Sequence, residues 1–232
     1  IKNSLDLCVL AMKPKSSDHA YGRLFFQNKS LVKIVEKTEM TKSESENDLN
    51  ICNSGMMIFN TKKLLKYIDK VGNLNKKKEF YLTDLVNIFY KYGLKTGYYL
   101  CDYEECKGVN NMQELSSANK IFQNRKRNFF LNKGVFMEDP STVFFSADTR
   151  IEKDVKIQPN VYFGVGVIVK NNVLIKSFTH LENTTVNRNV MIGPFSRIRD
   201  NVEIGSDVKI GNFVEIKKSD IKSGVKVSHL SY

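Results

Sequence analysis

Two basic residues near the C-terminal end of the chain have the types and the spacing to bind a phosphate group. Arg199 and Lys217 each directly follow an isoleucine, and they lie 18 residues apart. If 18 residues form one coil of a repeating structure, the two cations stack on the same outer face. Arg would then bind phosphate through paired hydrogen bonds, and Lys would add a point charge. The plainer alternative is two exposed basic residues on a basic surface.

The position of these cations depends on a six-residue period that begins near residue 150. Apolar residues recur at every sixth position, with one five-residue step after Leu181 and another after Ile216. The series is Ile151, Ile157, Phe163, Val169, Ile175, Leu181, Val186, Ile192, Ile198, Ile204, Ile210, Ile216, Ile221 and Val227. An α-helix has 3.6 residues per turn and cannot produce this period, whereas a hexapeptide repeat is typical of a parallel β-helix. Three repeats form a triangular coil of about 18 residues, and the inward side chains stack into a continuous core.

The first half of the chain alternates apolar strands with helical segments, which predicts an α/β sheet. The expected strands are 5–12, 51–59 and 95–101, with a hairpin formed by 23–26 and 31–35, a surface loop at 38–50, and helices at 61–71 and 84–92. We expect Leu64, Leu65 and Ile68 to form the apolar stripe of the first helix. Thr83 or Asp84 is expected to cap the second helix.

Residues 112–133 read as one long helix, which spans about 30 Å at ~1.5 Å per residue. Its predicted apolar face consists of Leu115, Ala118, Phe122 and Phe129, and Gly134 is expected to end it. This helix is expected to connect the two halves of the chain.

The composition limits the classes of function. The formal net charge is +11, but the basic residues are scattered, so we expect a solvated basic surface, with phosphate-bearing substrates favoured over nucleic acid. The four cysteines form no CxxC pair, which argues against a zinc site and favours reduced thiols in a cytoplasmic protein. No apolar run approaches the ~20 residues that span a bilayer, so no membrane insertion is expected.

Eight short segments, in order along the chain, match one known family. They are Tyr21-Gly22-Arg23, Ile34-Val35-Glu36-Lys37, Asn53-Ser54-Gly55, Tyr81-Leu82-Thr83-Asp84, Gly108-Val109-Asn110-Asn111, Ile192-Gly193-Pro194-Phe195, Gly211-Asn212-Phe213-Val214-Glu215 and His229-Leu230-Ser231-Tyr232. On these segments the chain resembles the bacterial bifunctional N-acetylglucosamine-1-phosphate uridylyltransferase / glucosamine-1-phosphate N-acetyltransferase. The resemblance covers nearly the whole chain.

The resemblance implies a uridylyltransferase site in the first half. Gly22, Glu36 and Asn53 would contact the N-acetylglucosamine moiety, and Asn110 would share the coordination of Mg²⁺. These types suit their roles, because glycine admits a ligand close to the backbone, and Glu and Asn supply acceptors and donors for sugar hydroxyls. The substrate of this half would be UTP.

The resemblance also implies an acetyltransferase site in the β-helix, with acetyl-CoA as the second substrate. Arg199 and Lys217 would bind the phosphate of glucosamine-1-phosphate, Tyr232 would contact the substrate, and His229 would act as general base. An imidazole that titrates near neutrality suits the removal of a proton from the amine. Glu215 is a weaker candidate for orienting His229. The family's usual Gly-His-Leu-Thr-Tyr stands here as Ser228-His229-Leu230-Ser231-Tyr232.

The predicted architecture is therefore α/β in three parts. Residues 1–111 are a partial Rossmann-like nucleotidyltransferase domain, 112–134 a linker helix, and 135–232 a left-handed parallel β-helix that forms a homotrimer. The family's Gly-rich phosphate loop, its metal-binding Asp and its later coils have no counterpart in the sequence. We therefore expect a fragment of an enzyme of UDP-N-acetylglucosamine synthesis, which supplies cell-wall precursors, and we expect the fragment alone to be inactive. Two alternatives are a monofunctional nucleotidyltransferase with a structural β-helix and a non-enzymatic trimerising scaffold.

Overall fold

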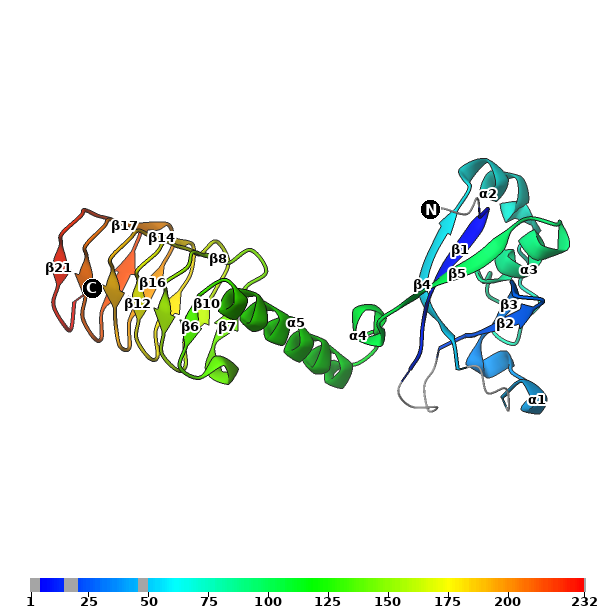
Figure 1. Cartoon of the computed structure of the whole chain (residues 1–232), viewed down its shortest axis with the longest axis horizontal. Coiled ribbons are helices and arrows are strands. Elements are labelled where there is room, and N and C mark those ends of the chain that lie inside the picture. The colour runs from blue at the N-terminus through cyan, green and yellow to red at the C-terminus, as the bar shows by residue number, and fades with distance from the viewer. Residues whose placement is uncertain (1–4, 15–20, 46–49, 232) are drawn as a thin grey trace. The chain divides into compact units, whose positions relative to one another are not determined.

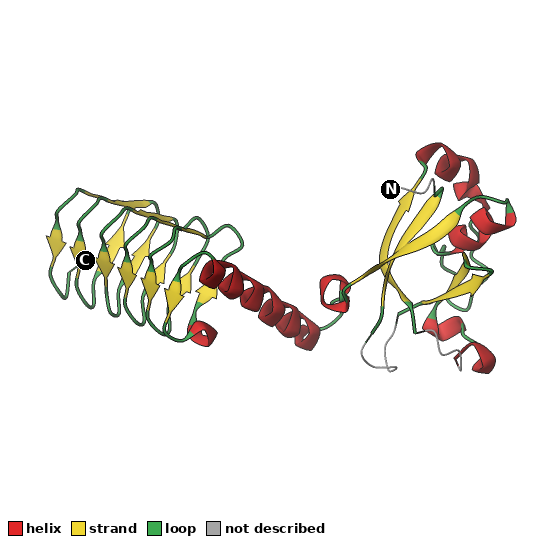
Figure 2. Ribbon diagram, in the orientation of Figure 1, coloured by secondary structure: helices red, strands yellow, loops and turns green. Residues whose placement is uncertain are grey.

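The computed structural model describes residues 5–14, 21–45 and 50–231, and it divides into two compact units, Ile1–Glu114 and Leu115–Tyr232. The first unit is built on a five-stranded sheet and the second on a parallel β-helix (Figure 1, Figure 2). The predicted α/β class with a β-helix of hexapeptide repeats is confirmed. No helix in the described part of the chain is long and apolar enough to cross a bilayer.

The sheet of the first unit has the strand order β3-β2-β4-β1-β5. Its strands are β1 (Leu7–Met12), β2 (Arg23–Gln27), β3 (Ser30–Val35), β4 (Cys52–Phe59) and β5 (Thr96–Cys101). The β1–β5 pair is parallel, and the other three pairs are antiparallel. The hairpin between β2 and β3 turns at Asn28 and Lys29, both with left-handed backbone angles, as a tight primed turn requires. The predicted strands and hairpin are therefore present, in a sheet with one parallel pair among the described strands.

Short helices accompany this sheet. They are α1 (Lys42–Ser45), α2 (Thr61–Tyr67), α3 (Asp84–Lys91) and α4 (Tyr103–Cys106), with 3-10 turns η1 (Lys37–Glu39) and η2 (Ile68–Lys70). The core packs β1 against α3 through Leu7, Val9, Leu85 and Phe89. Leu64 and Ile68 pack against this core, but Leu65 is 68% exposed, so its place in the predicted stripe is wrong. The expected loop at 38–50 contains η1 and α1, and its residues 46–49 lie outside the described part.

The long helix α5 (Met112–Asn132) is present, and Gly134 follows it with a left-handed backbone angle, as predicted. Its predicted apolar face is wrong for Leu115 and Phe129, which are exposed, whereas Ala118 and Phe122 are partly buried. The buried residues of the helix are Gln123, Arg127 and Phe130. Gln123 donates to the Phe145 carbonyl and accepts from the Phe145 N–H, both at 2.9 Å. Arg127 donates to the carbonyls of Val143 and Ser141. The buried face is polar because it satisfies backbone groups of the first coil.

The β-helix consists of three parallel sheets, one on each side of the coil (Figure 2). The first contains β7 (Phe144–Phe145), β10 (Tyr162–Phe163), β13 (His180–Leu181), β16 (Arg197–Arg199) and β19 (Glu215–Lys217). The second contains β8 (Arg150–Ile151), β11 (Ile168–Val169), β14 (Thr184–Val186), β17 (Val202–Ile204) and β20 (Asp220–Ile221). The third contains β6 (Phe136–Met137), β9 (Lys156–Ile157), β12 (Leu174–Ile175), β15 (Met191–Ile192), β18 (Lys209–Ile210) and β21 (Lys226–Val227), and the turn η3 (Pro140–Thr142) joins β6 to β7.

The inward series forms one continuous core. Every member of the six-residue series from Ile151 to Ile216 is at most 7% exposed, and Ile221 and Val227 pack against it partly buried. Phe163 stacks on Phe145 with ring centroids 5.1 Å apart. The five-residue step after Leu181 appears as a register of 17 between His180 and Arg197, whereas the other neighbouring strands of the same sheet are 18 residues apart. The period read from the sequence therefore fixes which side chains are inside.

One corner of the coil carries an exposed aromatic ladder, which we define as Phe178, Phe195 and Phe213. The rings stack with centroids 4.8 and 5.1 Å apart, and each side chain is about half exposed. All three residues have left-handed backbone angles, so the corner geometry turns each ring outward. This ladder is a continuous apolar strip on the surface of the coil.

Candidate functional site

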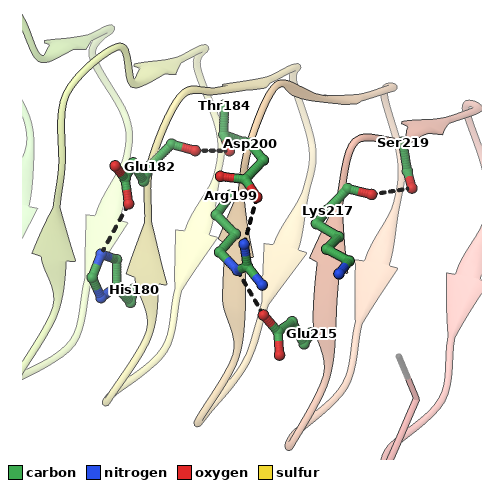
Figure 3. A network of polar contacts seen from close by, with 8 residues as sticks. All are labelled: His180, Glu182, Thr184, Arg199, Asp200, Glu215, Lys217 and Ser219. Carbon is green, nitrogen blue, oxygen red and sulfur yellow. Dashed lines mark hydrogen bonds and ion pairs between the residues drawn. The ribbon is translucent and has the colours of Figure 1, made fainter.

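The β-helix brings Arg199 and Lys217 together as predicted from their spacing. β16 and β19 are adjacent parallel strands, and Arg199 is the register partner of Lys217 (Figure 3). Both follow a buried isoleucine, so both project outward from the same sheet. They border a hollow of about 480 Å³ whose other polar residues are Glu215, Ser219 and Ser231.

The guanidinium of Arg199 is held between two carboxylates. Its Nε donates to Glu215 Oε1 at 2.7 Å, and its Nη1 pairs with the carboxylate of Asp200 (Figure 3). The hydrogen bond that Arg199 donates to Glu215 raises the pKa of Arg199, and the same contact lowers the pKa of Glu215. Since Arg has five N–H donors, Nη2 and one Nη1 hydrogen remain for a ligand. The ammonium of Lys217 makes no hydrogen bond or ion pair with any described residue. It is therefore a second cation, beside Arg199, that is available to a ligand.

His229 lies at a different place on the coil. His229 follows β21. A Cβ built on Gly211 would lie 3.0 Å from the backbone nitrogen of His229. His229 therefore lies one coil after Gly211, at the corner of the coil that comes before β19 in the preceding turn. Arg199 and Lys217 are the last residues of β16 and β19, so they lie at the opposite ends of these strands from that corner. The carboxylate of Glu215 binds Arg199, and no contact with His229 accompanies it among the described residues. The hypothesis that Glu215 orients His229 therefore gains no support. Tyr232 lies outside the described residues.

In the first unit, three of the predicted sugar-binding residues meet. Gly22 precedes β2, Glu36 follows β3, and Asn53 lies in β4. The Asn53 N–H donates to the Gly22 carbonyl at 2.8 Å. The carboxylate of Glu36 lies 3.0 to 3.1 Å from the point that a Cβ on Gly22 would occupy, so a side chain at residue 22 would displace it. The glycine is needed for this close approach.

Asn110 lies two residues after Gly108, which contacts Tyr21, the neighbour of Gly22 in the sequence. The Tyr21 hydroxyl accepts from the Gly108 N–H at 3.1 Å, and the Asn110 N–H donates to Glu114 Oε2 at 2.6 Å. The described residues contain no cluster of three or more His, Cys, Asp and Glu side chains that could hold a metal ion by itself. Metal binding by Asn110 stays a prediction, and an amide oxygen is a type of ligand that Mg²⁺ accepts.

A hollow of about 290 Å³ opens beside Glu36. Glu39, Tyr81, Thr83 and Asp84 line it with Glu36. Burial raises the pKa of Glu36, and the nearby Asp84 raises it further, whereas a hydrogen bond from Thr83 and the charge of Lys77 lower it. Burial also raises the pKa of Asp84. The sequence predicted Thr83 or Asp84 as a helix cap, not as part of this site. Since Thr83 is 47 residues from Glu36, no spacing rule could have joined them.

The chain is similar to known proteins over both of its units. The model for "Bacterial transferase hexapeptide (six repeats)" matches residues 183–218, which include Arg199 and Lys217. The "Bifunctional protein GlmU" of Bartonella quintana (strain Toulouse) is 41% identical over 217 residues, 94% of this chain and 48% of that protein. The chain is related to the bifunctional GlmU proteins. GlmU of Wolbachia pipientis wMel is 42% identical over 94% of the chain, and GlmU of Paramagnetospirillum magneticum is 43% identical over 97%.

The chain spans about half the length of the GlmU proteins it matches, 50% for Wolbachia and 49% for Paramagnetospirillum. Both units of the chain fall within the matched region, because the match covers at least 94% of it. Among solved structures, the acetyltransferase domain of PglB from Neisseria gonorrhoeae FA1090 gives a TM-score of 0.39 at 15% identity, covering 61% of this chain and 65% of that one. A likeness this slight supports no conclusion about function.

Proposed function

We propose that this chain takes part in the synthesis of UDP-N-acetylglucosamine through two reactions. On the β-helix, an acetyl group passes from acetyl-CoA to the amine of glucosamine-1-phosphate. In the first unit, N-acetylglucosamine-1-phosphate receives a uridylyl group from UTP. The observation that carries the proposal is the register pair of Arg199 and Lys217, which stands in a chain about 41–43% identical to bifunctional GlmU proteins.

In the acetyl transfer, Arg199 and Lys217 bind the phosphate of the amino sugar. The free Nη2 edge of Arg199 supplies paired donors, and Lys217 supplies the second positive charge. The amine attacks the thioester carbonyl, a C–N bond forms, the C–S bond breaks, and the thiol of coenzyme A leaves. His229 takes the proton that the ammonium gives up.

In the uridylyl transfer, a phosphate oxygen of the sugar phosphate attacks the α-phosphorus of UTP, and pyrophosphate leaves. Gly22, Glu36 and Asn53 orient the sugar, and positioning of this kind supplies most of the rate enhancement in such displacements. Mg²⁺, bound through Asn110 and the substrate phosphates, would supply charge neutralisation. The exposed aromatic ladder is consistent with a homotrimer built along the β-helix, because it offers an apolar strip that a second copy could cover.

Isothermal titration calorimetry of glucosamine-1-phosphate into the chain tests the phosphate site. Arg199→Gln and Lys217→Met should each weaken binding about tenfold or more, the usual effect of losing a hydrogen bond to a charged group. Arg188→Gln is the matched control, because Arg188 is an exposed arginine on the same β-helix outside this hollow. Asp200→Asn should strengthen binding, because it removes a carboxylate that competes for Arg199. Unchanged affinity in both cation variants would refute the site and favour a structural β-helix.

A further inference from the structure

The hydroxyl of Thr83 stands at the start of α3 but does not cap it. Thr83 is the N-cap residue, its side chain makes no cap hydrogen bond, and it is 9% exposed. The neighbouring helix α2 is capped normally, since Asn60 Oδ1 accepts from the Lys63 N–H at 3.3 Å. A threonine at an N-cap usually accepts from the backbone of the first turn. At α3 this contact is given up.

The hydroxyl instead contacts Glu36. Thr83 Oγ1 donates to Glu36 Oε1 across 3.4 Å, and the same carboxylate rests against the bare backbone of Gly22. Glu36 is thus fixed from two sides, by a donor on α3 and by the close surface of Gly22. Glu36 and Thr83 together line the hollow of about 290 Å³.

We propose that Thr83 is a positioning residue for the sugar-phosphate site, which holds the carboxylate of Glu36 in the orientation that accepts hydrogen bonds from the sugar. This inference rests on the proposed uridylyl transfer, because that reaction places the sugar against Glu36. One oxygen of Glu36 is bonded to Thr83, so the other is left for the ligand. Because the hydrogen bond from Thr83 already holds one oxygen of the carboxylate, Glu36 loses less conformational entropy when the sugar binds to the other oxygen.

The charges around Glu36 explain why the contact with Thr83 affects the pKa of Glu36. Burial opposes ionisation of Glu36 most strongly, and Asp84 on α3 acts in the same direction. Asp84 and Glu39 both line the same hollow. Lys77 and the Thr83 hydroxyl favour the ionised form, and Tyr81 lines the remaining wall. Removing the hydroxyl therefore raises the pKa of Glu36 further. As the pH falls, Glu36 then becomes protonated, and stops accepting, at a higher pH than in the wild type.

The test compares Thr83→Val, which keeps the shape and removes the donor, with Thr83→Ser, which keeps the donor. The pKa of the Glu36 carboxyl is measured by carbon-13 NMR titration of the full chain, and the affinity for N-acetylglucosamine-1-phosphate by calorimetry. We expect Thr83→Val to raise the pKa of Glu36 and weaken binding roughly tenfold at neutral pH, and Thr83→Ser to restore both. Since a raised pKa of Glu36 in the folded state also lowers stability at neutral pH, Thr83→Ser should restore the thermal transition as well. Thr61→Val, at the start of α2, is the control for loss of a hydroxyl.

Three outcomes separate the possibilities. An unchanged pKa of Glu36 in Thr83→Val overturns the positioning role. A raised pKa with weakened binding that Thr83→Ser restores supports it. If the wild-type chain does not bind the sugar phosphate at all but Thr83→Val still raises the pKa of Glu36, the contact is supported and the proposed uridylyl transfer is contradicted.

Discussion

The two units of this chain assemble their candidate sites in opposite ways. In the β-helix, a repeat fixes the site: Arg199 and Lys217 meet because they occupy the same position in successive coils. In the first unit, Gly22, Glu36 and Asn53 come from three separate segments, and a sheet of mixed direction brings them together. The first kind of site depends on a period, and the second on the particular path of the chain. The two should therefore fail differently when residues are changed.

The largest expected effects come from the two cores, and they test whether the units are energetically separate. Phe163 is 1% exposed and stacks on Phe145, whereas Phe89 is fully buried against Phe59 and Tyr67. Replacement of either by Ala should cost about 3–5 kcal/mol, the usual range for a buried aromatic residue. Hydrogen–deuterium exchange should show lost protection in the β-helix for Phe163→Ala and in the sheet for Phe89→Ala. Equal loss of protection in both units from one substitution would contradict the separation.

A smaller effect is expected where two coils touch. A Cβ on Gly205 would lie 2.6 Å from the Ser223 backbone nitrogen and 2.9 Å from the Lys222 carbonyl carbon. Gly205→Ala therefore forces the coils apart, at a cost of about 1–3 kcal/mol, as for other overpacked sites. The control is Gly72→Ala in the first unit, where a Cβ would meet nothing within 4 Å. The free energy of unfolding is measured with urea for both variants. If neither substitution changes it, the coils are not packed this tightly.

The smallest effect concerns the charge of Glu44 on α1. Hydrogen bonds from Lys33 and Thr41 lower the pKa of Glu44 from 4.5 to about 2, and its oxygen lies 2.5 Å from Lys33 Nζ. Because the pKa is lower in the folded state, the stabilisation is complete above pH about 4.5 and is lost as the pH falls towards 2. Since the pair is partly exposed, Glu44→Gln should cost less than about 1 kcal/mol at neutral pH and nothing near pH 2. Urea unfolding of the wild type, Glu44→Gln and Lys33→Gln at several pH values checks this; an unchanged effect of Glu44→Gln in the Lys33→Gln background would refute it.

The sequence predicted the repeat region well because one geometric rule governs it. A period of six determines the inward positions, and a separation of 18 determines that Arg199 stacks on Lys217. The same rule could not reveal that Asp200 and Glu215 engage Arg199, because that depends on side-chain direction. Nor could it predict the face of α5: Gln123 and Arg127 are buried to satisfy backbone groups, and a hydrophobic pattern carries no signal for this. In the first unit, strands and turns followed from local residue types. The contact between Thr83 and Glu36 did not, because it joins segments that only the folded chain brings together.

The polar face of α5 has a consequence for self-association. β7 is the last strand of its sheet, and the outer edge of such a strand offers unpaired N–H and C=O groups on which a foreign strand can add. Gln123 occupies both groups of Phe145 as a neighbouring strand would, and Arg127 covers the carbonyls that precede it. A second molecule therefore cannot extend this sheet into a filament at β7 unless it first displaces both side chains.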